Sequence, residues 1–263
     1  MTWLEGLLLG LLQGITEFLP VSSSGHIELG QALFGAHVSD DLMFSVVVHT
    51  ASMLSIMVVF RQDLAFLIKQ SLRFEWNPES RYVTMLLISM IPTGFAGLLF
   101  EKQIEVLFAG QILLVGFMLL VTAALLFSTR FVKKNDKDVS YRSALIIGIA
   151  QTIAIIPGIS RSGATIGTAL LLGIDKSKAT RFSFLMVLLP IAGGSLIKAI
   201  DLFGNIEKYS GELLPMITGF VASFIAGWIA CNWMLSIVRK GNIVYFSIYC
   251  IFIGLIAISF SVF

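Results

Sequence analysis

The sequence has little charge and few of the residues that bind metals or form redox centres. Charged residues make up 13% of its 263 positions, and it holds two cysteines and three histidines. Cys231 and Cys250 stand alone in apolar runs with no metal or redox spacing, so we expect small buried hydrophobic residues there. Walker motifs, dinucleotide-binding glycine motifs and Cys/His zinc spacings are also absent from the sequence.

Apolar residues are in large excess. Hydrophobic residues make up 57% of the chain, 21 positions are phenylalanine and the mean hydropathy is +0.91. A soluble domain of this length could not bury so much apolar surface, which indicates a polytopic membrane protein. The N-terminus carries Glu5 and lacks the basic region of a cleaved signal peptide, so we expect it to belong to the mature fold.

Six apolar stretches are long enough to cross a membrane. They are residues 42–60, 82–100, 106–128, 182–200, 213–237 and 242–262. Two further stretches, 2–35 and 143–173, are interrupted by breaks at Pro20–Gly25 and Pro157–Gly163. Such breaks are tolerated at membrane depth only where protein or a wet cavity surrounds them. The predicted fold is therefore an all-α polytopic membrane protein with six transmembrane helices plus two re-entrant helical hairpins.

The basic residues favour one orientation of this fold. Most Lys and Arg residues fall in loops on one side, including 130–142 and 175–181, when both interrupted stretches are re-entrant. Cytoplasmic loops carry the excess of Lys and Arg. We therefore expect both termini outside, the first hairpin entering from outside and the second from the cytoplasm, and a site that opens outward.

An internal repeat relates the two interrupted stretches within a single membrane domain, with halves of about 1–128 and 140–263. At an offset of 138 residues the matched pairs are Gly10 with Gly148, Gln13 with Gln151, Ser22 with Ser160, Ser24 with Ser162, and Gly25 with Gly163. Each half has one hairpin and three spans, and an odd number of spans inverts the second copy. The prediction is an inverted-topology repeat in which the two breaks face each other.

Gly6, Gly10 and Gly14 recur every four residues along the first apolar segment. This spacing gives one helix face of small residues, which predicts close packing against another helix.

The first break gathers polar side chains. Gln13 and Glu17 are four residues apart and share one helical face. An ionisable residue inside a membrane segment is functional by default, although Glu17 could instead satisfy the broken backbone near Pro20. His49, in the first full span, could line the site or make a core polar contact.

Three serines and a histidine follow the break. Ser22 and Ser24 fit an N-cap of the following helix as well as a direct role, because serine is a preferred capping residue. His26 is three residues after Ser23, so it could share a pocket with that hydroxyl as a general acid or base. A satisfied structural histidine is the alternative.

The second break carries Arg161 between Ser160 and Ser162, followed by Gly163 and Thr165. A guanidinium with hydroxyls beside a helix N-terminus suits a phosphate or diphosphate. The alternative is an arginine that pairs with Glu17 only to lock the two hairpins together.

These side chains fit phosphoryl transfer, which needs a positioned nucleophile, a base and positive charge over the phosphoryl oxygens. The rival interpretation is a transporter or lipid flippase, because inverted repeats with broken helices also build transporters. A carrier needs no nucleophile and base, so the grouping of Glu17, Ser23 and His26 favours an enzyme.

The motifs QGITEFLPVSSSGH and PGISRSGATIG resemble the two signature regions of the undecaprenyl-diphosphate phosphatase family, the bacitracin-resistance type. The resemblance extends over the whole chain. It implies hydrolysis of undecaprenyl diphosphate to undecaprenyl phosphate and inorganic phosphate, which recycles the lipid carrier of cell-wall synthesis in the bacterial inner membrane. The family carries Glu or Gln four residues before an essential Glu, and this chain has the Gln form.

The resemblance also implies roles for individual residues. Glu17, Ser23, His26 and Arg161 match the proposed catalytic residues. Ser160, Ser162 and Thr165 match the family's phosphate-contacting region, and we expect Gln13, Ser22 and Ser24 to contact the phosphate as well. A divalent cation, Mg²⁺ or Ca²⁺, is expected as a cofactor, with Glu17 as its candidate ligand. The expected partners are a polyprenyl diphosphate lipid and the membrane, without nucleic acid, and a homodimer is one assembly to consider.

Overall fold

The computed structural model describes residues 1–34, 41–100, 103, 111–132, 136–193, 195–196, 213–240 and 242–262. Within these ranges the chain is helical and forms no strand, apart from an isolated bridge between Lys137 and Ile174. The predicted all-helical class is confirmed. The ends of two predicted spans, 106–128 and 182–200, lie partly outside the described residues.

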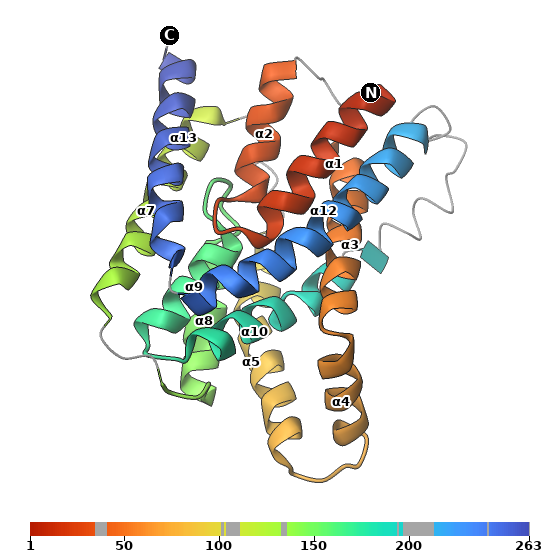
Figure 1. Cartoon of the computed structure of the whole chain (residues 1–263), viewed down its shortest axis with the longest axis vertical. Coiled ribbons are helices and arrows are strands. Elements are labelled where there is room, and N and C mark those ends of the chain that lie inside the picture. The colour runs from red at the N-terminus through yellow and green to blue at the C-terminus, as the bar shows by residue number, and fades with distance from the viewer. Residues whose placement is uncertain are drawn as a thin grey trace.

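The helices and their order along the chain are shown in Figure 1. They are α1 Trp3–Phe18, α2 Ser23–Phe34, α3 Asp41–Val59, α4 Arg61–Ser71, α5 Pro78–Leu99, α7 Ile112–Ser128, α8 Tyr141–Ile153, α9 Arg161–Leu171, α10 Lys176–Met186, α12 Leu213–Lys240 and α13 Tyr245–Val262. The stretch 182–200, predicted as one span, is divided at Val187, where α10 ends, and α4 lies between two of the predicted spans.

Membrane-crossing length and hydropathy are found in four described segments: α5, Ile112–Phe131, α12 and α13. A fifth candidate combines Met43–Val59 with α4, which are bent by 78° at Phe60. Large apolar side chains on these helices face outward, such as Phe95 and Phe252, each 63% exposed. A multi-pass membrane protein is therefore confirmed, because lipid is the solvent that such surfaces require.

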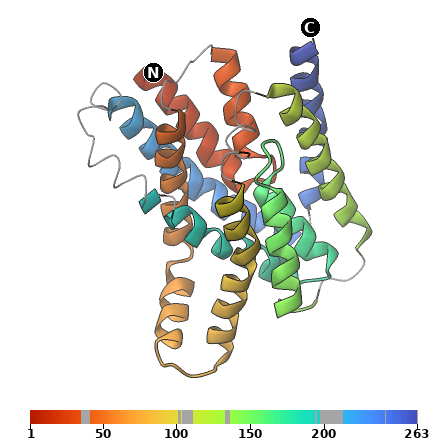
Figure 2. The same ribbon diagram turned by 180° about the vertical axis from the view of Figure 1, so that it is seen from behind.

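Two helical hairpins enter the bundle from opposite ends. The α1–α2 turn and the α8–α9 turn meet near the middle of the molecule (Figure 1), and the view from behind shows the same meeting point (Figure 2). α1 begins and α13 ends at one end of the bundle, whereas the α4–α5 turn lies at the other (Figure 1). Each hairpin thus brings its break into the interior.

The predicted glycine face of α1 packs tightly against α12, as expected from its spacing. A Cβ placed on Gly6 would lie 2.4 Å from the Pro215 carbonyl oxygen, and one on Gly10 would lie 2.3 Å from that of Gly219. On α8, a Cβ on Gly148 would lie 2.2 Å from the Ser89 carbonyl oxygen of α5. Only glycine permits backbones to approach this closely. The first helix of each hairpin therefore packs against a helix from the other half of the sequence.

Candidate active site

The first break is built around Ser22. Its backbone has φ of 70°, a left-handed conformation that is uncommon for a residue other than glycine. Its hydroxyl accepts a hydrogen bond from the Gly25 amide at 3.3 Å. Ser22 therefore caps the start of α2, which was one of the two roles left open for it.

The second break repeats this cap. The Ser160 hydroxyl accepts a hydrogen bond from the Gly163 amide at 3.0 Å and caps the start of α9. The pairs Ser22–Gly25 and Ser160–Gly163 are 138 residues apart, the offset of the predicted repeat. The predicted break extended to Gly163, but α9 begins two residues earlier, at Arg161, because the Ser160 cap satisfies an amide of its first turn.

The two breaks are in direct contact, as predicted. The Ser162 hydroxyl donates to the Leu19 carbonyl at 3.0 Å, and it lies 3.3 Å from the Ser160 hydroxyl. A Cβ on Gly25 would lie 3.2 Å from Gly158 Cα, and Gly158 itself has φ of 93°. Glycine is needed at Gly158 both for this backbone conformation and for the close approach.

Glu17 is the centre of the polar cluster. Its carboxylate forms an ion pair with Arg161 through one oxygen. The other oxygen accepts from the Ser23 hydroxyl at 2.6 Å and from the Gln13 amide at 3.0 Å. His49 Nε2 lies 3.7 Å from that same oxygen. The structure thus joins Gln13, Glu17, Ser23 and Arg161, which were expected together, and it brings the candidate His49 to the same carboxylate.

Burial makes this cluster electrostatically strong. The Glu17 side chain is 3% exposed, whereas the Arg161 side chain keeps 29% of its surface exposed. A buried charge is tolerated when it is paired and hydrogen-bonded, as the Glu17 carboxylate is here. Because the guanidinium has five N–H donors and remains accessible, it can bind an anion in addition to Glu17.

His26 faces a different helix. Its Nδ1 lies 2.8 Å from the Ser22 carbonyl oxygen, and its Nε2 lies 2.8 Å from the Tyr249 hydroxyl on α13. Among the described residues, no hydrogen bond joins His26 to Ser23, which donates to Glu17 instead. The spacing of three residues places both side chains on the first turn of α2, but they make separate contacts.

The remaining predicted residues support the breaks. Thr165 donates to the Arg161 carbonyl at 2.9 Å and also bonds the Ser183 hydroxyl, which ties α9 to α10. The Ser24 hydroxyl lies 3.4 Å from that of Ser22. These contacts hold the two turns in shape.

Two further polar contributors were not predicted from the sequence. Tyr249 bonds His26, and Thr122 of α7 accepts from the Ser160 amide at 3.0 Å while it donates to the Gly158 carbonyl at 3.2 Å. Both lie in apolar spans far from the breaks, and no local pattern marks them. His49 was named as a candidate because an imidazole is unusual in an apolar span.

The cluster does not form a metal site from protein ligands alone. Within the described ranges, no group of three or more His, Cys, Asp or Glu residues could hold a metal ion. Both Glu17 oxygens are already engaged, whereas Mg²⁺ and Ca²⁺ need six or more oxygen ligands. A cation here would take most of its oxygens from water or from a bound ligand.

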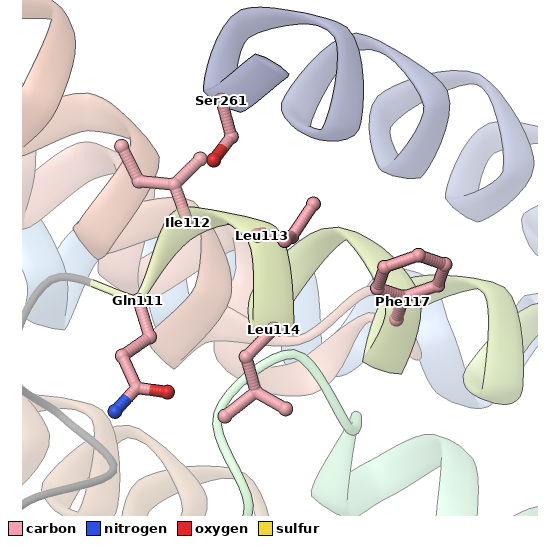
Figure 3. A pocket seen from close by; sticks show the side chains of 6 residues that line it. All are labelled: Gln111, Ile112, Leu113, Leu114, Phe117 and Ser261. Atoms are coloured by element: carbon pink, nitrogen blue, oxygen red, sulfur yellow. The ribbon is translucent and has the colours of Figure 1, made fainter.

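A surface hollow near the start of α7 is separate from this chemistry (Figure 3). Its lining residues are Gln111, Ile112, Leu113, Leu114, Phe117 and Ser261. None of them belongs to the polar cluster around Glu17, and most are apolar.

Comparison with known proteins gives consistent matches. The family model described as "Bacitracin resistance protein BacA" matches residues 6–256. A protein of Christiangramia forsetii named undecaprenyl-diphosphatase is 50% identical over 259 residues, which cover 98% of this chain and 97% of that protein. A namesake from Bacteroides thetaiotaomicron is 46% identical, covering 98% of each chain, and undecaprenyl-diphosphatase 1 of Bacillus cereus is 39% identical, covering 98% and 97%.

Proposed function

This chain belongs to the bacitracin resistance protein BacA family, and on that premise we propose that it hydrolyses undecaprenyl diphosphate. The products are undecaprenyl phosphate and inorganic phosphate. The reaction takes place in the bacterial inner membrane, recycles the lipid carrier for cell-wall synthesis and confers resistance to bacitracin.

One observation carries the mechanism: a single buried carboxylate, Glu17, contacts both the Ser23 hydroxyl and the Arg161 guanidinium. A carboxylate 2.6 Å from a hydroxyl oxygen is within reach to accept its proton. A guanidinium beside it supplies the positive charge that phosphoryl transfer requires. Glu17, the proposed base, therefore contacts both the nucleophile and the anion-binding group.

In the proposed reaction, the Ser23 oxygen attacks the terminal phosphorus as Glu17 takes the hydroxyl proton. The bond between that phosphorus and the bridging oxygen breaks, and undecaprenyl phosphate leaves. Water then cleaves the phosphoserine and releases inorganic phosphate. Direct attack by a water in place of Ser23 gives the same products, and His26 is the second group assigned to proton transfer.

Arg161 and the amides at the start of α9 hold the diphosphate in this proposal. A helix N-terminus favours a negative charge, and Ser160 and Ser162 place hydroxyls beside it. A divalent cation, Mg²⁺ or Ca²⁺, fits only as a companion of the diphosphate, with Glu17 as its protein ligand.

The proposed topology has six transmembrane helices and two re-entrant hairpins in an inverted repeat, with the site open to the outside. Three observations support it. The hairpins enter from opposite ends, α1 begins where α13 ends, and the α4–α5 turn lies at the opposite end (Figure 1). The basic-residue bias puts that turn in the cytoplasm.

The Ser23→Ala enzyme tests the nucleophile. Purified in detergent, it should release phosphate from a polyprenyl diphosphate at least about a hundredfold more slowly than the wild type. Full activity would eliminate the serine nucleophile and leave the water route. Detergent-solubilised protein has no second compartment, so absence of phosphate release by the wild type under varied cations would favour the transporter or flippase.

A further inference from the structure

We infer that Tyr249 is a positioning residue that holds His26 in one orientation through its Nε2 atom. This inference rests on the proposed function only for its consequence in catalysis. The contact itself joins α2 with α13 across 223 residues of sequence.

The two bonds of the imidazole define which nitrogen carries the proton. The Ser22 carbonyl can only accept a hydrogen bond, so the Nδ1 atom of His26 must be the donor at 2.8 Å. In the neutral ring, Nε2 is then the acceptor, and the Tyr249 hydroxyl must donate to it at 2.8 Å. Both nitrogens of a ring that is only 7% exposed are therefore satisfied.

Ring packing supports the same contact. The His26 and Tyr249 rings are nearly parallel, with an interplanar angle of 9° and centroids 5.6 Å apart. A buried imidazole with a hydrogen bond at each nitrogen and a parallel ring beside it has little freedom to turn. The Ser22 carbonyl belongs to the strained residue of the first break, so the orientation of His26 depends on that break as well.

This arrangement makes Nε2 the nitrogen through which His26 gains or loses a proton. Nδ1 keeps its proton because the Ser22 carbonyl holds it. The Tyr249 hydroxyl can donate to the neutral ring and, after rotating, accept from the protonated ring. Tyr249 therefore supports His26 in both protonation states.

The test compares Tyr249→Phe with Tyr245→Phe. The first variant removes the hydroxyl and keeps the ring. The second removes a hydroxyl from another tyrosine of α13, which is 69% exposed and makes no hydrogen bond through its hydroxyl to the described residues. Assays of phosphate release should give a kcat for Tyr249→Phe that is about five- to tenfold lower, which is the effect expected from losing one hydrogen bond, and an unchanged KM. Tyr245→Phe should match the wild type.

Two further readouts separate positioning from simple packing. In a His26→Ala background, Tyr249→Phe should cause no additional loss, because its effect passes through the imidazole. In ¹⁵N-histidine spectra the Nε2 resonance of His26, one of three histidines, should move toward that of a nitrogen without a hydrogen bond. The His26→Ala variant assigns that resonance.

Equal losses from Tyr249→Phe in both backgrounds, or an unmoved Nε2 resonance, would overturn the inference. If the wild-type protein releases no phosphate, the proposed function fails, while the spectra still decide whether Tyr249 holds His26. The two failures are therefore distinguishable.

Discussion

The two hairpins share a serine cap and carry different chemistry. In each, a serine caps the inner helix through the amide three residues later, Ser22 for α2 and Ser160 for α9. At the offset of 138 residues, the next position is Ser23 in the first hairpin and Arg161 in the second. Glu17 has Ile155 as its counterpart, and His26 has Ala164. The repeat supplies the same cap hydrogen bond twice, although φ is 70° at Ser22 and −71° at Ser160, and the side chains provide an attacking group in one hairpin and an anion-binding group in the other.

Removing the arginine should have the largest effect on this division. Arg161→Ala should lower phosphate release by at least about a thousandfold, because the charge over the phosphoryl oxygens is lost. It should also lower the free energy of unfolding by about 3 kcal/mol, because Glu17 remains buried and unpaired. Phosphate release and thermal unfolding in detergent measure the two effects.

Two variants serve as controls for that experiment. The double variant Glu17→Ala/Arg161→Ala should recover part of the stability but none of the activity. Arg181→Ala breaks the ion pair between Arg181 and Asp63. Because these side chains are 35% and 42% exposed, the free energy of unfolding should fall by only about 1 kcal/mol. If Arg161→Ala kept normal activity, the second hairpin would hold no part of the active site.

Substitutions of the glycines at the two breaks should lower the free energy of unfolding by different amounts. Gly158→Ala should destabilise the protein by about 3 kcal/mol, because φ is 93° and the new Cβ would lie 2.5 Å from the Val115 carbonyl oxygen. Gly25→Ala should lower the free energy of unfolding by about 1 kcal/mol, because its closest contacts, a Val115 side-chain carbon at 3.0 Å and Gly158 Cα at 3.2 Å, are less severe. Equal losses in thermal unfolding would contradict the difference.

The capping serines should show the smallest effects. Ser160→Ala should cost about 1 kcal/mol in unfolding free energy, the usual value of an N-cap. Ser22→Gly should cost less than Ser22→Ala, because glycine adopts the φ of 70° without strain. A larger loss for Ser22→Gly than for Ser22→Ala would show that the backbone at the first break is not strained.

Local features of the fold could be predicted from the sequence. The two breaks, their contact and the packing face of α1 followed from spacing and composition. The start of α5 was predicted four residues late, at 82, although Asn77 and Pro78 are a capping residue and a favoured first helical residue. The bend after α3 was not predicted. The charged, partly amphipathic stretch that begins at Arg61 is typical of a loop, but it forms the helix α4 directly after α3.

The site could be predicted only where its residues share a motif. Gln13, Glu17, Ser23 and Arg161 come together as expected, since the two motifs meet. The partner of His26 could not be predicted, because a spacing of three residues on α2 does not say which neighbouring helix each side chain faces. Tyr249 and Thr122 reach the breaks only through tertiary packing.

The cross-packing of the halves also has a consequence for biosynthesis. α1 is synthesised before α12, the helix that closes its glycine face. Until then the Glu17 hairpin cannot be enclosed on that side, and polar backbone exposed to lipid is unfavourable. In the proposed topology, the first hairpin would therefore need shelter, by the translocation machinery or at the membrane surface, until α12 is synthesised.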